Sequence, residues 1–301
     1  MSGLYDAFQR RLHVTGTLVT ETGLHIGAAT DGLDPTAVDN AVVRLPDGRP
    51  YIPGSSLKGV LRSFMERLQN SPGHWLVSPG APPSECLHNE SRKDLVKQFK
   101  RHRRSERELA EFVWDHLCPV CRLFGSQEFA GRVLVADLMP LEDRVLLERR
   151  HGVAIDRDTR TAAGGALFDL EVVAPGTRFA LSILVENPSD AQVRDLMVVL
   201  LALSNGEIAL GAKTASGLGR VRLVDARIAD YGARDVLAAA WGGARPSYSL
   251  AEYVRLLGLE AEEPRVSREA LQAALAALGP EVTWQQAQAV LREVFGGERG
   301  A

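Results

Sequence analysis

The fold is decided by residues 39–68, DNAVVRLPDGRPYIPGSSLKGVLRSFMERL, which predict a strand, a tight turn, a short extended piece and an amphipathic helix. Pro46, Asp47 and Gly48 have turn chemistry, because Pro presets φ, Asp bonds to its own backbone and Gly accepts a positive φ. Apolar residues beyond Gly54 recur at helical spacing and predict one buried face. These residues are Leu57, Val60, Leu61, Phe64, Met65 and Leu68.

The start of this helix has features of a phosphate-binding site. Ser55 or Ser56 is expected to cap the helix, and Lys58 and Arg62 follow one turn apart. Free N–H groups and the positive end of the dipole suit a helix N-terminus to phosphate. The GxxxxGKS/T spacing of a nucleotide-binding P-loop is missing. An ordinary capped core helix explains the same residues, so both interpretations stand.

The rest of the pattern indicates an α+β protein. Alternating apolar and polar residues over 10–27 predict a half-buried strand with Leu12, Val14 and Leu18 inside. A strand is also predicted at 131–139, a hairpin around the turn 174–177, a capped helix at 189–210, and a glycine loop followed by a last strand over 211–228. The order β, α, β, β, α, β favours a ferredoxin-like core over residues 10–228 with insertions.

A glycine-rich loop, GAKTASGLG at 211–219, lies between the second helix and the last strand. Glycines without a Cβ allow backbone amides to approach a phosphate or a base, so Gly217 and Gly219 are candidate contacts. Lys213 and Arg220 add positive charge. A tight structural turn is the alternative, and anion contact is the favoured interpretation.

An insert at about 70–125 holds the cysteines. Cys118 and Cys121 form a CxxC motif, whose thiolates can share one metal ion, and zinc is the common occupant of such sites. A redox pair is the alternative, but redox CxxC motifs open a helix, whereas this one is expected to close the predicted helix 108–117. Unliganded buried thiols are the third possibility.

The remaining ligands are expected upstream. Cys86 is the candidate third ligand and His88 the fourth, with His102 and His116 as rivals. A site filled by Cys and His has no open position for catalysis, so its role would be structural.

Three further segments stand apart from the predicted core. Residues 92–107 are strongly basic and predict a solvated helix face or, alternatively, a phosphate-contacting patch. Residues 149–169 are polar, basic and glycine-bearing, so they predict an exposed hairpin. Residues 229–301 shift to Ala, Leu and Glu and predict a helical C-terminal extension, with helices at 249–258, 267–278 and 283–295.

Composition limits the functional classes. The 301 residues have a net charge of −3, so any nucleic-acid site must come from local patches. No apolar run is long enough for a membrane span, and the N-terminus lacks a signal-peptide core. Three cysteines, two of them in CxxC, suit a reducing cytoplasm. We therefore expect a cytoplasmic protein without a membrane partner.

Four motifs taken together resemble one known family. They are TGLHIGA (22–28), VDNAVVRLPDGRPYIPGSSLKGVLRSFME (38–66), CPVCRLFGS (118–126) and LGAKTASGLGRVRL (210–223). The combination is similar to the RAMP superfamily of CRISPR–Cas proteins over residues 11–226. Within it, the motifs resemble the repeated backbone subunit of type III effector complexes, the Csm/Cmr class and its type III-D relatives.

The resemblance implies an RRM-like core with an inserted zinc-bearing subdomain and a β-hairpin thumb, here 149–169. Such subunits stack with like subunits and other effector subunits along a guide RNA (crRNA), and the thumb intrudes into the guide–target duplex at regular intervals. The residues expected to hold guide phosphates are Ser55, Ser56, Lys58, Arg62, Lys213, Gly217, Gly219 and Arg220.

In many family members an aspartate before the second strand cuts the target RNA with a divalent cation such as Mg²⁺, and the 2′-hydroxyl attacks. The matching residue is Asp39, with Asp31 and Asp34 as rivals in the same loop. One alternative is a structural subunit that binds guide RNA without cutting. Another is a processing endonuclease using His25, which is disfavoured because GLHIG is interpreted as fold-forming.

Overall fold

The computed structural model describes residues 5, 7–27, 40–71, 76–89, 92–101, 105–155, 162–240 and 243–259. The chain divides into two compact units, Met1–Leu257 and Gly258–Ala301. The predicted helices at 267–278 and 283–295 fall outside the described residues. None of the helices in the described part combines the length and apolarity needed to cross a membrane.

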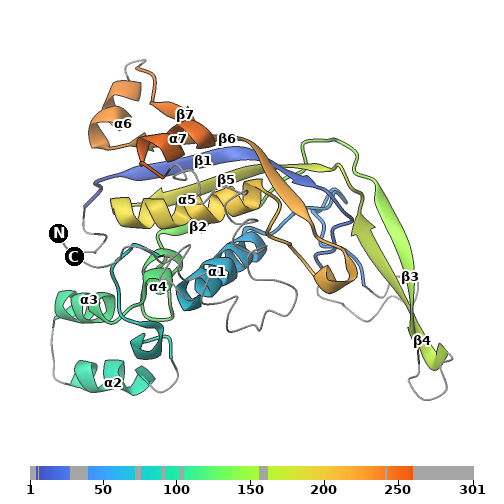
Figure 1. The fold of residues 1–301 in the computed structure, drawn as a ribbon, viewed down its shortest axis with the longest axis horizontal. Coiled ribbons are helices and arrows are strands. Elements are labelled where there is room, and N and C mark those ends of the chain that lie inside the picture. The colour runs from blue at the N-terminus through green and yellow to red at the C-terminus, as the bar shows by residue number, and fades with distance from the viewer. Residues whose placement is uncertain are drawn as a thin grey trace, which may run out of the picture. The chain divides into compact units, whose positions relative to one another are not determined.

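The first unit is built on a five-stranded antiparallel sheet (Figure 1). Its strands lie in the order β2-β5-β1-β6-β7. The α+β class with an antiparallel sheet is therefore confirmed. The bounds are β1 Arg11–Thr20, β2 Val133–Val135, β5 Arg178–Glu186, β6 Val221–Tyr231 and β7 Ser247–Ser249.

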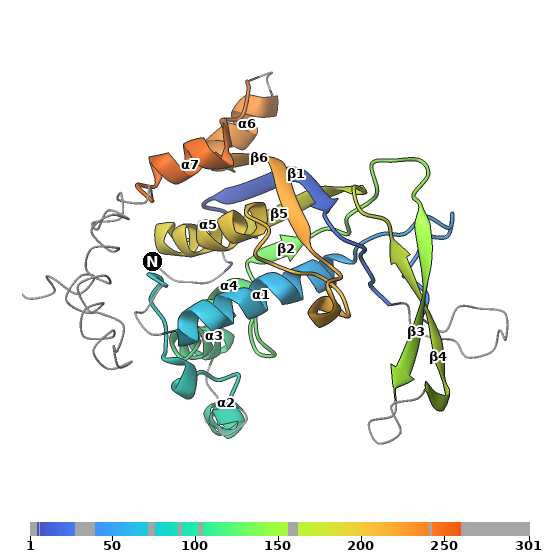
Figure 2. The ribbon, with the colours of Figure 1, turned by 45° about the vertical axis from the view of Figure 1, so that its right-hand side comes forward.

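Two helices pack against one face of this sheet (Figure 2): α1, Gly54–Asn70, and α5, Asp190–Ser204. The alternation predicted for β1 is borne out, because Leu12, Val14 and Leu18 are fully buried beneath the helices. The capping of α5 follows from its sequence, since Ser189 and Gln192 form a reciprocal capping box. The core elements thus occur in the order β1-α1-β2-β5-α5-β6.

The predicted hairpin around 174–177 is wrong. The strand before the turn, β4 (Ala162–Val173), pairs with β3 (Leu147–Ile155) in a separate two-stranded sheet, whereas β5 after the turn joins the main sheet. Hydrogen bonds between Thr20 and Thr177 hold the turn and redirect the chain. The predicted exposed hairpin 149–169 lies within β3 and β4, except that residues 156–161 are among those not described.

The predicted second strand, 41–45, is also absent from the sheets. Val42 and Arg44 make only isolated bridges, to Gly27 and Pro50. This segment instead bonds to the base of β4, where the Asn40 N–H donates to the carbonyl of Asp169 at 3.2 Å. The short strand β2 takes the place in the sheet next to β5.

The insert between α1 and β2 contains a 3-10 turn η1 (Pro83–Glu85) and three helices. These are α2 Lys93–Arg101, α3 Glu106–Asp115 and α4 Pro119–Phe124. The buried carboxylate of Asp195 in α5 accepts hydrogen bonds from the amides of Val77 and Ser78. The basic run forms the mostly exposed helix α2, as the solvated-face interpretation predicts.

The compact unit continues past the core boundary predicted at residue 228. After β6, the helix α6 (Ala233–Ala240) leads to β7, which pairs with β6 and so extends the sheet. Helix α7, Leu250–Leu256, follows directly and falls within the predicted helix 249–258. Residues 229–257 therefore belong to the same compact unit as the core.

We expect Gly54→Ala to lower the free energy of unfolding by about 1–3 kcal/mol. A Cβ at Gly54 would lie 2.2 Å from the carbonyl oxygen of Val135, so α1 and β2 would have to separate. Gly59→Ala is the matched control, because a Cβ there meets nothing within 4 Å and alanine favours a helix. Chemical denaturation measures both; equal stability of the two variants would contradict the close approach.

Candidate nucleic-acid interface and metal cluster

The N-terminus of α1 bonds to another segment of the protein. The N-cap is Pro53, and no side chain in the first turn caps the helix, so the expectation that Ser55 or Ser56 does so is wrong. Instead the Asp137 carboxylate, from the segment after β2, accepts a hydrogen bond from the Gly54 N–H at 2.7 Å. A carboxylate here satisfies the positive end of the helix and leaves less of it for a phosphate.

Lys58 and Arg62 line a cavity of about 630 Å³ between α1, the insert and the loop 124–131. Burial, and then the neighbouring Arg62 guanidinium, lower the pKa of Lys58. Among the described residues Lys58 makes no ion pair, so an anion that entered the cavity would relieve the repulsion between the two cations.

Arg62 is tied into the protein. Its guanidinium donates to the Glu66 carboxylate at 2.8 Å, to the Gly125 carbonyl at 2.8 Å and to the Cys121 sulfur at 3.4 Å. Arg62 therefore joins α1 to the cysteine cluster. The prediction of a pure RNA contact missed this role, which depends on residues far along the chain.

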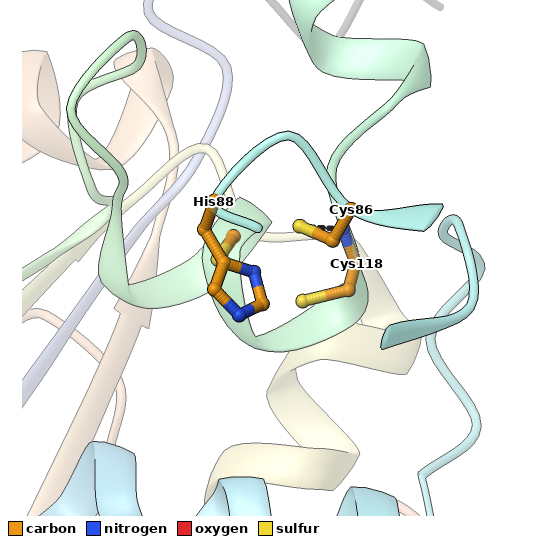
Figure 3. Close-up of side chains that lie close together, drawn as sticks. Cys86, His88 and Cys118 are labelled. Carbon is orange, nitrogen blue, oxygen red and sulfur yellow. Dashed lines mark hydrogen bonds between the residues drawn. The ribbon is translucent and has the colours of Figure 1, made fainter. Parts of the chain in front are cut away.

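The four predicted metal ligands come together. One donor atom from each of Cys86, His88, Cys118 and Cys121 lies within 4.8 Å of every other. Figure 3 shows Cys86, His88 and Cys118 converging from the segment after η1 and from the start of α4. The three cysteines are free and buried, whereas His88 is exposed.

The thiols of the cluster influence one another's ionisation. A hydrogen bond with Cys118 lowers the pKa of the Cys86 thiol, whereas hydrogen bonds with Cys118 and Cys86 raise the pKa of Cys121. A bound divalent cation would allow all three sulfurs to ionise, which tetrahedral Cys₃His sites require.

The context of the CxxC motif differs from the expectation. Helix α3 ends at Asp115, and Cys118 is the N-cap of α4, so the motif opens a helix instead of closing one. That placement alone would suit a redox pair. The third thiol and the imidazole beside it favour a metal cluster instead.

The rival ligands do not join the cluster within the described residues. The His116 Nδ1 donates to the Phe112 carbonyl at 2.8 Å, in the last turn of α3. His102 lies outside the part of the chain that the structure describes.

The glycine loop is a tight turn with a charged exterior. The amides of Gly217 and Gly219 donate to the carbonyls of Thr214 and Gly23, so these predicted contacts use their N–H groups within the protein. Gly219 has φ +79°, and a Cβ would lie 2.0 Å from the Leu210 oxygen. The loop, with its 3-10 turn η3 (Thr214–Ser216), offers side chains, above all the exposed Lys213.

The glycine loop borders the β3–β4 hairpin. In both ribbon views it is beyond the end of α1 that begins at Gly54 (Figures 1 and 2). A second cavity, of about 240 Å³, is formed with the base of the β3–β4 hairpin by Arg150, His151, Lys213 and Ser216. Arg220, in contrast, pairs with Glu21 at 2.9 Å.

The candidate cleavage residues Asp31, Asp34 and Asp39 all lie outside the described residues. The next residue in the chain, Asn40, is exposed and bonds to β4 at Asp169 and Glu171. The buried Glu171 carboxylate also accepts from the Val42 amide at 3.1 Å and pairs with Arg44.

His25 is buried and its Nδ1 donates to the Glu171 carbonyl at 2.7 Å, which agrees with the fold-forming interpretation of GLHIG. One site feature was missed from the sequence. His151 and Asp169 face each other across the hairpin. Pairing 149–169 about its centre would have placed Arg149 opposite Asp169, so the sequence pattern did not contain this register.

Comparison with known proteins identifies related chains. A family model described as the RAMP superfamily matches residues 17–222. A Methanocaldococcus jannaschii protein named CRISPR system Cms endoribonuclease Csm3 is 26% identical over 230 residues, covering 71% of this chain and 78% of the relative. Proteins of the same name are similar: 25% identical over 219 residues in Enterococcus italicus (71% and 90% covered) and 31% over 188 in Mycobacterium tuberculosis (58% and 64%).

Proposed function

The chain belongs to the RAMP superfamily, and on that premise we propose that it is a guide-RNA-binding backbone subunit of a type III CRISPR effector complex that cleaves complementary target RNA through Asp39. The observation that carries the proposal is the similarity to relatives named endoribonuclease Csm3 over 71% of the chain. We place it in the cytoplasm, with other effector subunits, guide RNA and target RNA as partners.

The architecture supports this proposal. The element order β1-α1-β2-β5-α5-β6 with strand order β2-β5-β1-β6 is that of a ferredoxin-like core. The hairpin β3–β4 is the proposed thumb, and residues 229–257 extend the core by α6, β7 and α7. The insert is the proposed zinc subdomain.

We propose a structural zinc ion held by Cys86, His88, Cys118 and Cys121. Support comes from the convergence of the four donor atoms within 4.8 Å of one another. The ion would join the segment after η1 to the start of α4, and Arg62 would bond to one of its ligands. Its chemistry there is to neutralise thiolates, not to activate water.

A divalent cation such as Mg²⁺ is the proposed assistant of cleavage. The described residues form no carboxylate cluster that fits it; their one candidate metal group is the Cys/His cluster. The acidic residues expected to serve it, Asp31, Asp34 and Asp39, are not described.

A structural subunit that binds guide RNA without cutting is the alternative function. The guide-RNA-binding part of the proposal is tested directly by purifying the tagged chain from cells that express a guide array. We expect guide RNA to co-purify and to be protected from added nuclease. Absence of bound RNA from the intact complex would contradict both the proposal and this alternative.

Lys58→Ala should weaken guide-RNA binding equally for all guide sequences. Lys58 lines the 630 Å³ cavity and has no ion-pair partner among the described residues. It is therefore the predicted contact residue that is most available to a phosphate. Loss of one contact to single-stranded RNA should flatten the slope of log K against log salt by about 0.7. Filter binding at several salt concentrations measures this slope.

A second variant, Lys97→Ala, is the control for Lys58→Ala. Lys97→Ala removes an exposed cation on α2 that pairs with Asp94, and it should leave the slope unchanged. If Lys97→Ala flattens the slope while Lys58→Ala does not, the RNA surface is the basic helix α2. A loss that depends on guide sequence would contradict phosphate contact by Lys58.

A further inference from the structure

We propose that His151 and Asp169 form a catalytic dyad in which His151 is the general base for RNA cleavage. This inference rests on the proposed function and adds a proton acceptor that the aspartate assignment lacks. The two residues are direct cross-strand partners in the β3–β4 hairpin. The Nδ1 of His151 lies 2.5 Å from an Asp169 carboxylate oxygen.

The carboxylate selects the useful tautomer. Since Asp169 accepts a hydrogen bond, Nδ1 carries the proton, and the lone pair of the neutral ring is on Nε2. A carboxylate that orients an imidazole in this way also stabilises the imidazolium that forms when a proton arrives. The His151 side chain is 73% exposed, so Nε2 can reach a bound nucleotide.

Other described histidines lack this combination. His25 is buried against a carbonyl, and His116 bonds to the Phe112 carbonyl. His13 contacts the Ser182 hydroxyl, and His88 lies beside Cys121 in the metal cluster. Among the histidines that the structure describes, His151 is the one paired with a carboxylate.

The dyad is next to the candidate cleavage loop. The Asn40 amide donates to the Asp169 carbonyl at 3.2 Å, and the Asn40 side chain lies 3.4 Å from the same oxygen. Asp39 is one peptide bond from Asn40. The dyad therefore lies beside Asn40, the residue that follows Asp39 in the sequence.

The charges around the dyad suit an RNA phosphate. Arg149 lies 3.6 Å from Asp169 on the same hairpin, and Arg150 and Lys213 line the 240 Å³ cavity with His151. Cations placed there attract the phosphodiester and stabilise the negative charge that develops on it. Protonation of His151 would add charge but remove the proton acceptor.

The reaction is an intramolecular transesterification. The 2′-hydroxyl of the target nucleotide transfers its proton to His151 Nε2, and its oxygen bonds to the adjacent phosphorus. The bond from phosphorus to the 5′-oxygen breaks, and that oxygen takes a proton from water. The products are a 2′,3′-cyclic phosphate and a 5′-hydroxyl, and the imidazolium returns its proton to solvent.

Single-turnover cleavage by the assembled effector complex tests the dyad, with complementary target RNA bound in excess enzyme. We expect His151→Gln to cut at least about 100-fold more slowly, since general-base catalysis contributes 10²–10⁴-fold. Asp169→Asn should be slowed in the same direction, and target affinity should stay within about twofold. His13→Gln, the same substitution in β1, should cut like wild type.

A pH profile of the cleavage rate distinguishes a catalytic role of His151 from a structural role. A general base must be unprotonated to act, so the wild-type rate should depend on pH, and His151→Gln should lack that dependence. Equal slowing at every pH together with lost target binding would assign the pair a structural role. Products with 3′-hydroxyl ends would overturn attack by the 2′-hydroxyl.

Two results distinguish this inference from the proposed function. Wild-type rates in His151→Gln, with Asp39→Ala inactive, would overturn the dyad and leave the proposed function intact. A wild-type complex that binds complementary target without cutting it would overturn both.

Discussion

Replacing Asp39 with alanine should abolish target cleavage at the positions served by this subunit while leaving target binding unchanged. In the proposed function the Asp39 carboxylate would act on the reacting phosphodiester, whereas affinity would come from base pairing with the guide and from cationic side chains such as Lys58, which lines the 630 Å³ cavity. We expect at least about a 100-fold loss of the cleavage rate. Labelled target RNA in the assembled complex, followed on denaturing gels, measures it.

Asp31→Ala and Asp34→Ala are the matched controls, because both residues occupy the same predicted loop. They should cut at wild-type rates. Full activity in Asp39→Ala would transfer the function to one of these residues or to another subunit. If wild type and Asp39→Ala bind target but neither cuts, the structural alternative is correct.

Replacing Cys118 with serine should remove the metal and destabilise the insert. Cys118 opens α4 and lies among the other three donors, so losing its thiolate leaves an incomplete site. Structural zinc sites contribute on the order of 10 kcal/mol to folding. Elemental analysis should show metal falling from about one ion per chain to nearly none, and thermal unfolding should occur at lower temperature.

His116→Gln is the control for this change. His116 is close to Cys118 in the sequence, but its ring bonds to the Phe112 carbonyl. It should keep its metal. Full retention of metal in Cys118→Ser, or loss in His116→Gln, would contradict the proposed ligand set.

The predicted metal ligands show what sequence can reveal. CxxC spacing restricts two thiols to one ion, and a nearby Cys and His complete a familiar donor set. The structure brings all four together, although Cys86 and Cys118 are separated by two helices. The apolar periodicities were also informative: β1 buries the residues that its pattern selects, and α1 buries Leu57, Leu61 and Met65, whereas Val60, Phe64 and Leu68 are half-buried.

The hydrogen-bond partners at the start of α1 could not be predicted from the sequence in the same way. Ser55 and Ser56 have good capping chemistry, yet the acceptor for Gly54 comes from Asp137. Arg62 has the position of a phosphate contact, yet it bonds to Gly125 and Cys121. These partners depend on tertiary packing, which a local pattern does not contain.

The turn at 174–177 shows a related limit. Two apolar strands around a Pro-Gly turn normally pair with each other. Here Thr20 bonds to Thr177 and Ala174, and the chain passes from one sheet to another. Strand pairing is a long-range choice, so turn chemistry predicts the turn but not the partners of its strands.

Mapping of the cut sites tests the central claim most directly. The complex assembled with one guide is incubated with a complementary and with a non-complementary RNA, and fragment ends are sequenced. The account predicts cuts at regular intervals within the guide-paired region, absent from the non-complementary RNA and lost with Asp39→Ala. Cuts independent of guide pairing, or cuts that persist in Asp39→Ala, would contradict it.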